Sequence, residues 1–126
     1  MRAVDTNVLV RLVTRDDAKQ VAVAEAFVGK GAWVSHLALA EASWVLSAVY
    51  DLEHPAIATV IEMLLNHKDL ALEESEVVAN ALEAFRKRPA LGFSDCLMLE
   101  VARKAGHLPL GTFDRNLGKL EGAERL

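Results

Sequence analysis

Short apolar runs alternate with longer amphipathic segments along this chain, and this alternation limits the folds that it can adopt. The apolar runs lie at residues 2–5, 32–35, 70–72 and 108–113. Strands separated by helices predict a parallel sheet with helices on both faces. We therefore expect an α/β fold with a short, mostly parallel central sheet of about four to five strands. The length is that of one domain, residues 1–126.

The helical segments are marked by their apolar spacing and by the residues at their ends. Pro55 suits the first turn of a helix whose apolar residues recur at i, i+3, i+4 and i+7. Pro89 and Gly106 each mark the end of such a segment. Helices are expected from Val8, over 17–28, over 37–52, from Pro55, over 75–88 and over 95–105.

Composition excludes several classes of protein. Hydrophobic residues make up 52% of the chain, which excludes a disordered protein. The one cysteine, Cys96, rules out a disulfide framework and a multi-cysteine zinc site, and we expect it to be buried. No stretch reaches the ~20 apolar residues of a membrane span, and Asp5 and Arg11 interrupt the layout of a signal peptide. These features fit a reducing cytoplasm.

The net charge of −4 argues against a protein that coats nucleic acid through its overall field. It does not argue against a nuclease. Clustered carboxylates lower the net charge themselves, and a bound metal ion returns positive charge to the same place.

Two carboxylates are expected where strands end. Asp5 closes the first apolar run, and in open parallel sheets ligands bind at the carboxyl ends of strands. The alternative for Asp5 is a helix cap that accepts hydrogen bonds from the amides of Asn7 or Val8. Asp114 follows the last apolar run, with Thr112 one strand period before it, and an ordinary turn is its alternative.

Two further acids, Glu41 and Asp95, are expected on apolar helix faces that point toward the protein body. A charge in such a place costs several kcal/mol unless it is compensated. Asp95 also suits the first turn of a helix capped by Ser94. Glu25 also lies on an apolar helix face, although we expect it to be partly exposed. Several acids on such faces are therefore stronger evidence than a single one. The apolar neighbours are Leu37, Trp44 and Val45 for Glu41, and Met98, Leu99 and Ala102 for Asp95.

Together the four acids predict a site for a hard divalent metal, formed chiefly by Asp5 and Asp95 with Glu41 and Asp114 close by. Mg²⁺ and Mn²⁺ prefer oxygen ligands and are held by a few carboxylates, waters and substrate phosphate. Such an ion polarises a phosphodiester and activates water. The chain has no histidine pair with zinc spacing, no glycine-rich phosphate loop and no Gly-x-Ser-x-Gly elbow.

These residues, in this order, resemble the PIN-domain nucleases, and more closely the VapC-type toxins of bacterial type II toxin–antitoxin pairs. The resemblance covers nearly the whole chain, and Ser94 and Cys96 stand where alanines are commoner in the family. The matching motifs are Ala3 to Arg11, Leu39 to Ala42, Phe93 to Met98, and Thr112 to Asp114.

The resemblance implies a metal-dependent endoribonuclease in which the four acids are both the catalytic residues and the metal ligands, with Mg²⁺ as the metal and Mn²⁺ as an alternative. It implies that Thr6 or Thr112 supports the ligands through hydrogen bonds. It also implies a homodimer that is inhibited by a small antitoxin, whose C-terminal segment occupies the acidic groove.

Self-association is also suggested by the apolar surface of the segments at 37–52 and 55–66, which exceeds what a small sheet covers. Trp44, Ile57 and Ile61 belong to this surface. The alternative is that all of it is core, but closed two-fold dimers are the commonest assembly.

Three other functions remain open. One is a PIN-like RNA-processing nuclease without an antitoxin. Another is a metal-dependent phosphatase with a strand-end aspartate as nucleophile, which typically has a second aspartate where Asn7 stands. The third is a metal-free binding module that keeps the fold without cleaving.

Overall fold

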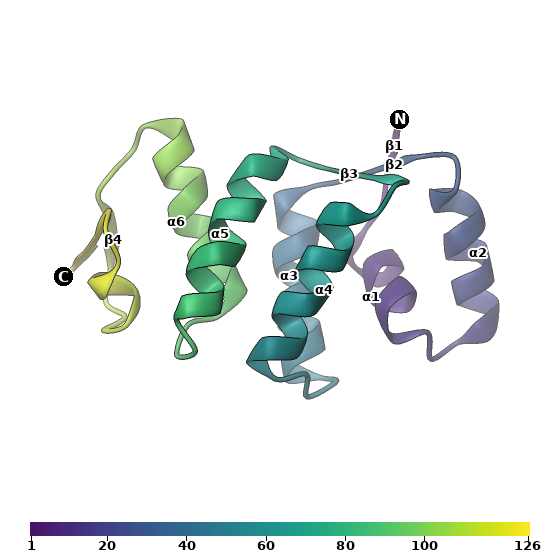
Figure 1. Ribbon diagram of the computed structural model, residues 1–126, viewed down its shortest axis with the longest axis horizontal. Helices are drawn as coiled ribbons and strands as arrows, with labels where there is room; N and C mark the ends of the chain where they lie inside the picture. Colours follow the sequence, from purple (N-terminus) through teal and green to yellow (C-terminus); the bar gives the residue numbers. More distant parts are fainter.

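The computed structural model describes residues 1–126 and has six α-helices and two small parallel sheets. The molecule is elongated, with α6 and β4 toward one end and α1 and α2 toward the other (Figure 1). The helices are α1 (Thr6–Thr14), α2 (Ala18–Val28), α3 (His36–Ala48), α4 (His54–Asn66), α5 (Ser75–Lys87) and α6 (Phe93–Ala105). The strands are β1 (Arg2–Ala3), β2 (Ala32–Val34), β3 (Leu70–Leu72), β4 (Leu110–Thr112) and β5 (Ala123–Arg125), and a 3₁₀ helix η1 covers Leu117–Lys119.

The helix beginnings follow local capping chemistry. Asp17 and Ser35 precede α2 and α3, and each side chain accepts a backbone N–H from the first turn of its helix. The expected cap at Ser94 is wrong, because α6 begins at Phe93 and its N-cap is Gly92. The helices are otherwise those expected, although α3 ends at Ala48 and is therefore shorter than the expected segment.

The α/β fold is confirmed, but the strands are divided between two sheets instead of one. The first sheet is parallel with the order β1-β2-β3, and the second pairs β4 with β5 in parallel. The strand β5 was not expected from the sequence. No strand pairing joins β4 to β1, so the carboxyl ends of these two strands lie in different sheets.

The core is formed by the first sheet together with α1 and the helices α3 to α6. Leu39 and Leu46 of α3 are buried there with Ile57 and Ile61 of α4. The apolar surface of Ile57 and Ile61 is therefore core and cannot serve self-association. None of the helices has the length and apolar character that crossing a bilayer requires.

The chain after α6 forms a C-terminal unit, residues 108–126, that contains β4, η1 and β5. The unit is held to the body by buried Leu117 and by the Arg103 guanidinium, whose Nη2 donates to the Glu121 carbonyl at 2.7 Å. Inside the unit, η1 and β5 approach closely. A Cβ added at Gly118 would lie 2.7 Å from the Cβ of Arg125. This position therefore requires glycine because of space.

Candidate active site

Asp5 lies two residues after β1 and caps α1. Its Oδ1 accepts the Val8 N–H at 3.1 Å, so the expected capping role is confirmed. The side chain is exposed, and its second oxygen accepts no hydrogen bond from the chain. One oxygen of this carboxylate thus fixes its orientation, while the other faces solvent at the carboxyl end of β1.

Asp114 lies two residues after β4 in a tight turn. Its Oδ1 accepts the N–H groups of Asn116 and Leu117, both at 2.8 Å. The Thr112 hydroxyl accepts the Asp114 N–H at 3.0 Å. The turn expected as the alternative role of Asp114 is therefore present. Thr112 holds the backbone of Asp114, and the two amides hold its side chain, so the carboxylate has a fixed direction although it is exposed.

Asp95 lies half-buried in the first turn of α6. Burial raises the pKa of this carboxyl above its ordinary value, and the negative charge of Asp114 raises it further, while the Gly92 N–H acts in the opposite direction. Burial is the larger cause, and repulsion from the charge of Asp114 is the smaller one. The influence of Asp114 also shows that these two acids lie in the same region.

Glu41 is exposed on α3, and the expectation that its face points toward the protein body is wrong. Its helical neighbours Leu37 and Trp44 are 75% and 63% exposed. The helix α3 is apolar on nearly every side, so its sequence contains more than one apolar stripe and the spacing cannot choose between them. The stripe that is buried consists of Ala38, Leu39, Ala42, Ser43 and Leu46.

The structure brings Asp95 and Asp114 into one region but does not gather the four acids. No three side chains of His, Cys, Asp or Glu form a group that could hold a metal ion. The chemistry of the donors fits Mg²⁺ or Mn²⁺, because all four are carboxylates. One or two carboxylates with waters and substrate phosphate are enough to hold Mg²⁺, so such a site does not need all four acids. Thr6, the other expected supporting residue, is half-buried in the first turn of α1.

An open, mainly apolar hollow of about 630 Å³ lies beside Asp5, between the start of the chain and the helices α1 and α2. Its lining includes Val8, Val23 and Phe27, and Arg11 is one of its five polar residues. The Arg2 guanidinium stacks over the Phe27 ring, 3.8 Å from the ring centre. An exposed carboxylate therefore borders an apolar surface that nothing in the chain covers.

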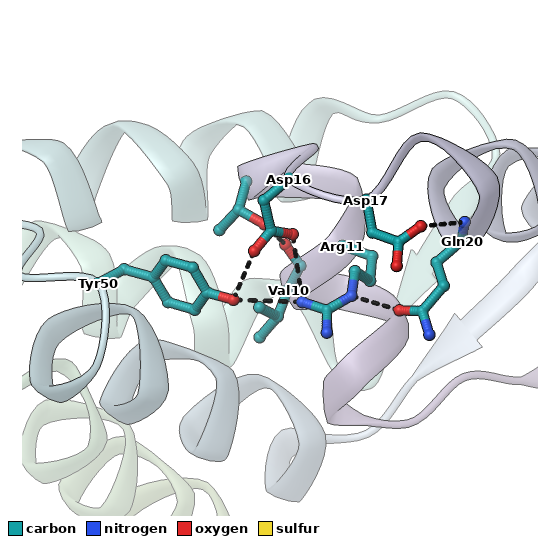
Figure 2. Close-up of polar contacts among 7 residues, drawn as sticks. Val10, Arg11, Asp16, Asp17, Gln20 and Tyr50 are labelled. Carbon is teal, nitrogen blue, oxygen red and sulfur yellow. Dashed lines mark hydrogen bonds and ion pairs between the residues drawn. The ribbon is translucent and has the colours of Figure 1, made fainter.

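A polar network that the sequence did not predict lies near this hollow (Figure 2). Arg11 Nη1 donates to Asp16 Oδ1 and to the Tyr50 hydroxyl, both at 3.2 Å, and the Tyr50 hydroxyl donates to Asp16 Oδ2 at 3.0 Å. Arg11 also donates to Gln20 on α2. Hydrogen bonds from Thr14 and then Tyr50 lower the pKa of Asp16. The network joins α1 and α2 to the end of α3, and no spacing rule connects residues so far apart in sequence.

Comparison with known protein families identifies the family of this chain. The PIN domain model matches residues 2–123. The chain belongs to the PIN domain family. No curated protein and no solved structure matches the chain. PIN domains are generally nucleases that act on RNA or DNA and use divalent metal ions, so this chain has the fold of a hydrolase acting on nucleic acids. The closer resemblance to VapC-type toxins stays a prediction.

Proposed function

We propose that this PIN domain is a Mg²⁺-dependent endoribonuclease that hydrolyses RNA phosphodiester bonds, with Mn²⁺ as the alternative metal. The observation that carries this proposal is the family match over residues 2–123, because it spans all four acids in their motif order. The proposed nuclease domain covers residues 1–126 and acts in the cytoplasm.

The proposed metal ligands and catalytic residues are Asp5, Glu41, Asp95 and Asp114. Two of them support the proposal by their local geometry. Asp5 keeps one carboxylate oxygen free at the end of β1, and Asp114 is held in a fixed direction by two amides. Thr112 supports Asp114 through its backbone, and Thr6 is the proposed support on the side of Asp5.

We further propose that the enzyme is the toxin of a toxin–antitoxin pair. An inhibiting peptide suited to this surface carries an arginine that pairs bidentately with Asp5 or Asp95, and apolar side chains beside it. The open hollow beside Asp5, with Val8 in its lining, supports this proposal because it offers apolar anchorage next to the acid. Exposed Trp44 offers a second apolar anchor.

An RNA-processing nuclease without an antitoxin remains the principal alternative, and no geometric observation favours the phosphatase. The residue two places after Asp5 is Asn7, which lies on the lining of the same hollow. An amide cannot act as the acid that phosphatases of the aspartyl-phosphate kind place there.

The test is an RNase assay with purified protein, end-labelled RNA, and Mg²⁺, Mn²⁺ or a chelator. We expect cleavage with metal and none with the chelator. Asp5→Asn and Asp114→Asn should each lower the cleavage rate about 100-fold or more. Asp51→Asn is the matched control, because Asp51 is exposed and asparagine tolerates its positive φ of 57°.

Two further substrates separate the alternatives. Single-stranded DNA tests whether the activity is specific for RNA, and a small phosphate monoester tests for a phosphatase. Cleavage that persists in the chelator, or phosphate release without RNA cleavage, would contradict the proposal. Intact RNA under every metal condition would favour the binding module.

A further inference from the structure

A second pocket, of about 420 Å³, lies where the end of α3, the start of α4 and the turn before α6 meet. These segments lie at the lower ends of the helices in Figure 1. Aromatic and polar side chains share its lining: Trp44 is 63% exposed, and Glu53 and Ser94 supply polar groups. A pocket of this size and mixed lining suits a small organic group such as a nucleotide base.

The pocket borders the candidate active site. Gly92 and Ser94 line it, and Asp95 follows them directly. A Cβ built at Gly92 would lie 3.7 Å from Asp95 Oδ2, so the wall of the pocket lies against this carboxylate. On α3, Trp44 follows Glu41 by three residues and shares its helix face. An RNA strand whose phosphate reaches these acids can therefore place a neighbouring base in the pocket.

The start of α6 supplies hydrogen-bond donors to the pocket. Its N-cap is Gly92, and no side chain caps the helix. The N–H groups of Phe93 and Ser94 donate to no acceptor in the chain, and both residues line the pocket. Free amides at the positive end of a helix favour an oxygen atom of a ligand.

Glu53 supplies the complementary acceptor. It is the exposed N-cap residue of α4, and its side chain makes no capping hydrogen bond. A carboxylate accepts two neighbouring N–H donors at once, one on each oxygen. Its negative charge repels a phosphate, so the pocket suits a neutral group better than an anion.

A polar atom without a partner lies at the same place. The Nε2 atom of His54 is buried and forms no hydrogen bond, and the ring stacks on Phe85 with 3.8 Å between the ring centres. Both side chains line the pocket. Buried polar atoms nearly always have a partner, and a ligand that enters the pocket can supply one.

We propose that this pocket binds a guanine base of the RNA strand, next to the bond that is cleaved. The inference rests on the proposed nuclease function and adds base specificity to it. Guanine alone carries a carbonyl oxygen beside two adjacent N–H donors, because adenine lacks the oxygen and the pyrimidines lack the donor pair. Glu53 accepts N1–H and N2–H of the base, an amide at the start of α6 donates to O6, and Trp44 stacks on the ring.

Binding without cleavage tests the inference. The Trp33→Phe chain keeps Trp44 as its single tryptophan, and a base that stacks on this indole quenches its fluorescence. The ligands are pentaribonucleotides with one variable base between uridines, and a chelator prevents cleavage. The guanosine ligand should bind about tenfold more tightly than the other three. Inosine, which lacks only the amino group of guanosine, should lose most of this advantage.

Glu53→Gln in the same background should bind all four ligands alike, with an unchanged circular dichroism spectrum. Glu74→Gln is the matched control, because Glu74 is the exposed N-cap of α5 and also makes no capping hydrogen bond. This control should keep the preference for guanosine. Equal binding of the four ligands, absence of quenching, a preference that persists in Glu53→Gln, or competition by inorganic phosphate would each overturn the inference.

Cleavage in Mg²⁺ separates this inference from the proposed function. The wild type should cut a mixed-sequence RNA next to guanosines. Glu53→Gln should raise KM for the guanosine ligand about tenfold, and the rate at saturation should fall less. An active wild type that cuts without regard to the neighbouring base would overturn the base pocket. A wild type that binds guanosine RNA in preference and cleaves no RNA would contradict the nuclease function and would support the pocket.

Discussion

At the scale of single residues, the acids combine structural and chemical roles that sequence reasoning treats as alternatives. Asp5 caps a helix and Asp114 closes a turn, and each uses Oδ1 for that purpose. The second oxygen of each carboxylate remains available. A backbone amide bonded to one oxygen fixes the direction of the other without neutralising the charge. The capping and turn roles therefore leave one oxygen of each acid free and with a fixed direction.

Asp95→Asn should raise the free energy of unfolding at neutral pH. Burial and the charge of Asp114 raise the pKa of Asp95 in the folded protein. The folded state thus holds this proton more tightly than the unfolded state. The resulting stability is complete below the ordinary pKa and is lost as pH rises through the raised value. Removing the charge should add up to about 0.5 kcal/mol at pH 7, because the side chain is only half-buried.

Urea denaturation across the acid-to-neutral range measures this effect, with Asp51→Asn as the control for loss of an exposed carboxylate. The Asp95→Asn chain should be less sensitive to pH than the wild type. A lower stability of Asp95→Asn at neutral pH would show that its carboxylate is needed for folding, contrary to the reading of Asp95 as a functional acid.

Cys96 should be unreactive in the folded protein. Its side chain is 1% exposed, and burial together with the charges of Asp95 and Glu100 raises the pKa of its thiol to about 11. The thiolate is the reactive form, so an aromatic disulfide reagent at pH 8 should react slowly with native protein and fully with protein in denaturant. Fast, complete labelling of the native chain would contradict the buried position.

At the scale of helices and strands, the sequence predicts what depends on local spacing. The amphipathic pattern from Pro55 and the glycine after α6 locate those helices closely. The spacing of apolar residues does not predict the buried face of α3, because a helix that is apolar on nearly all sides can bury any of several faces. We expected Glu41 on the buried face, and it lies on an exposed one. The spacing also fails for β5, whose Ala-Glu-Arg segment has no strand signal.

The candidate site, too, could be predicted from the sequence only in part. Its acids could be located at the ends of β1 and β4 from the sequence, since each follows an apolar run. Whether those ends meet depends on which strand pairs with which, and strands of two or three residues do not specify their neighbours. The network of Arg11, Asp16 and Tyr50 joins α1 and the loop after it to the turn after α3, which no single segment encodes.

Tyr50→Phe should loosen the contact between α3 and the loop after α1. The substitution removes the hydroxyl that bonds both Asp16 and Arg11. The midpoint of thermal unfolding at neutral pH should fall by a few degrees. The lowered pKa of Asp16 means that its stabilising effect is present above its ordinary pKa and is lost as pH falls through the lowered value.

The difference between wild type and Tyr50→Phe should therefore shrink in acid. Asp16→Asn and the double variant complete a mutant cycle that isolates the pair, and their effects should be less than additive. A difference that stays constant with pH would mean that Tyr50 acts through packing alone.

At the scale of the whole molecule, the proposed role as a toxin predicts an effect on cells. Induction of the chain alone should stop growth, and co-expression with the product of a neighbouring antitoxin gene should restore it. Asp5→Asn should be harmless at the same protein level, while Asp51→Asn should stop growth as the wild type does. A harmless wild type at strong induction would contradict the toxin role and would leave the nuclease proposal standing.

The close approach of Gly118 to Arg125 has a consequence for any survey of variants by cell survival. Every side chain at this glycine would push β5 from its place, so cells that carry such a variant should survive like cells that lack a catalytic acid. A survival map would then score a packing glycine as an essential residue. Reading protein abundance beside survival would distinguish the two groups: substitutions at Gly118 would lower abundance, and Asp5→Asn would leave it unchanged.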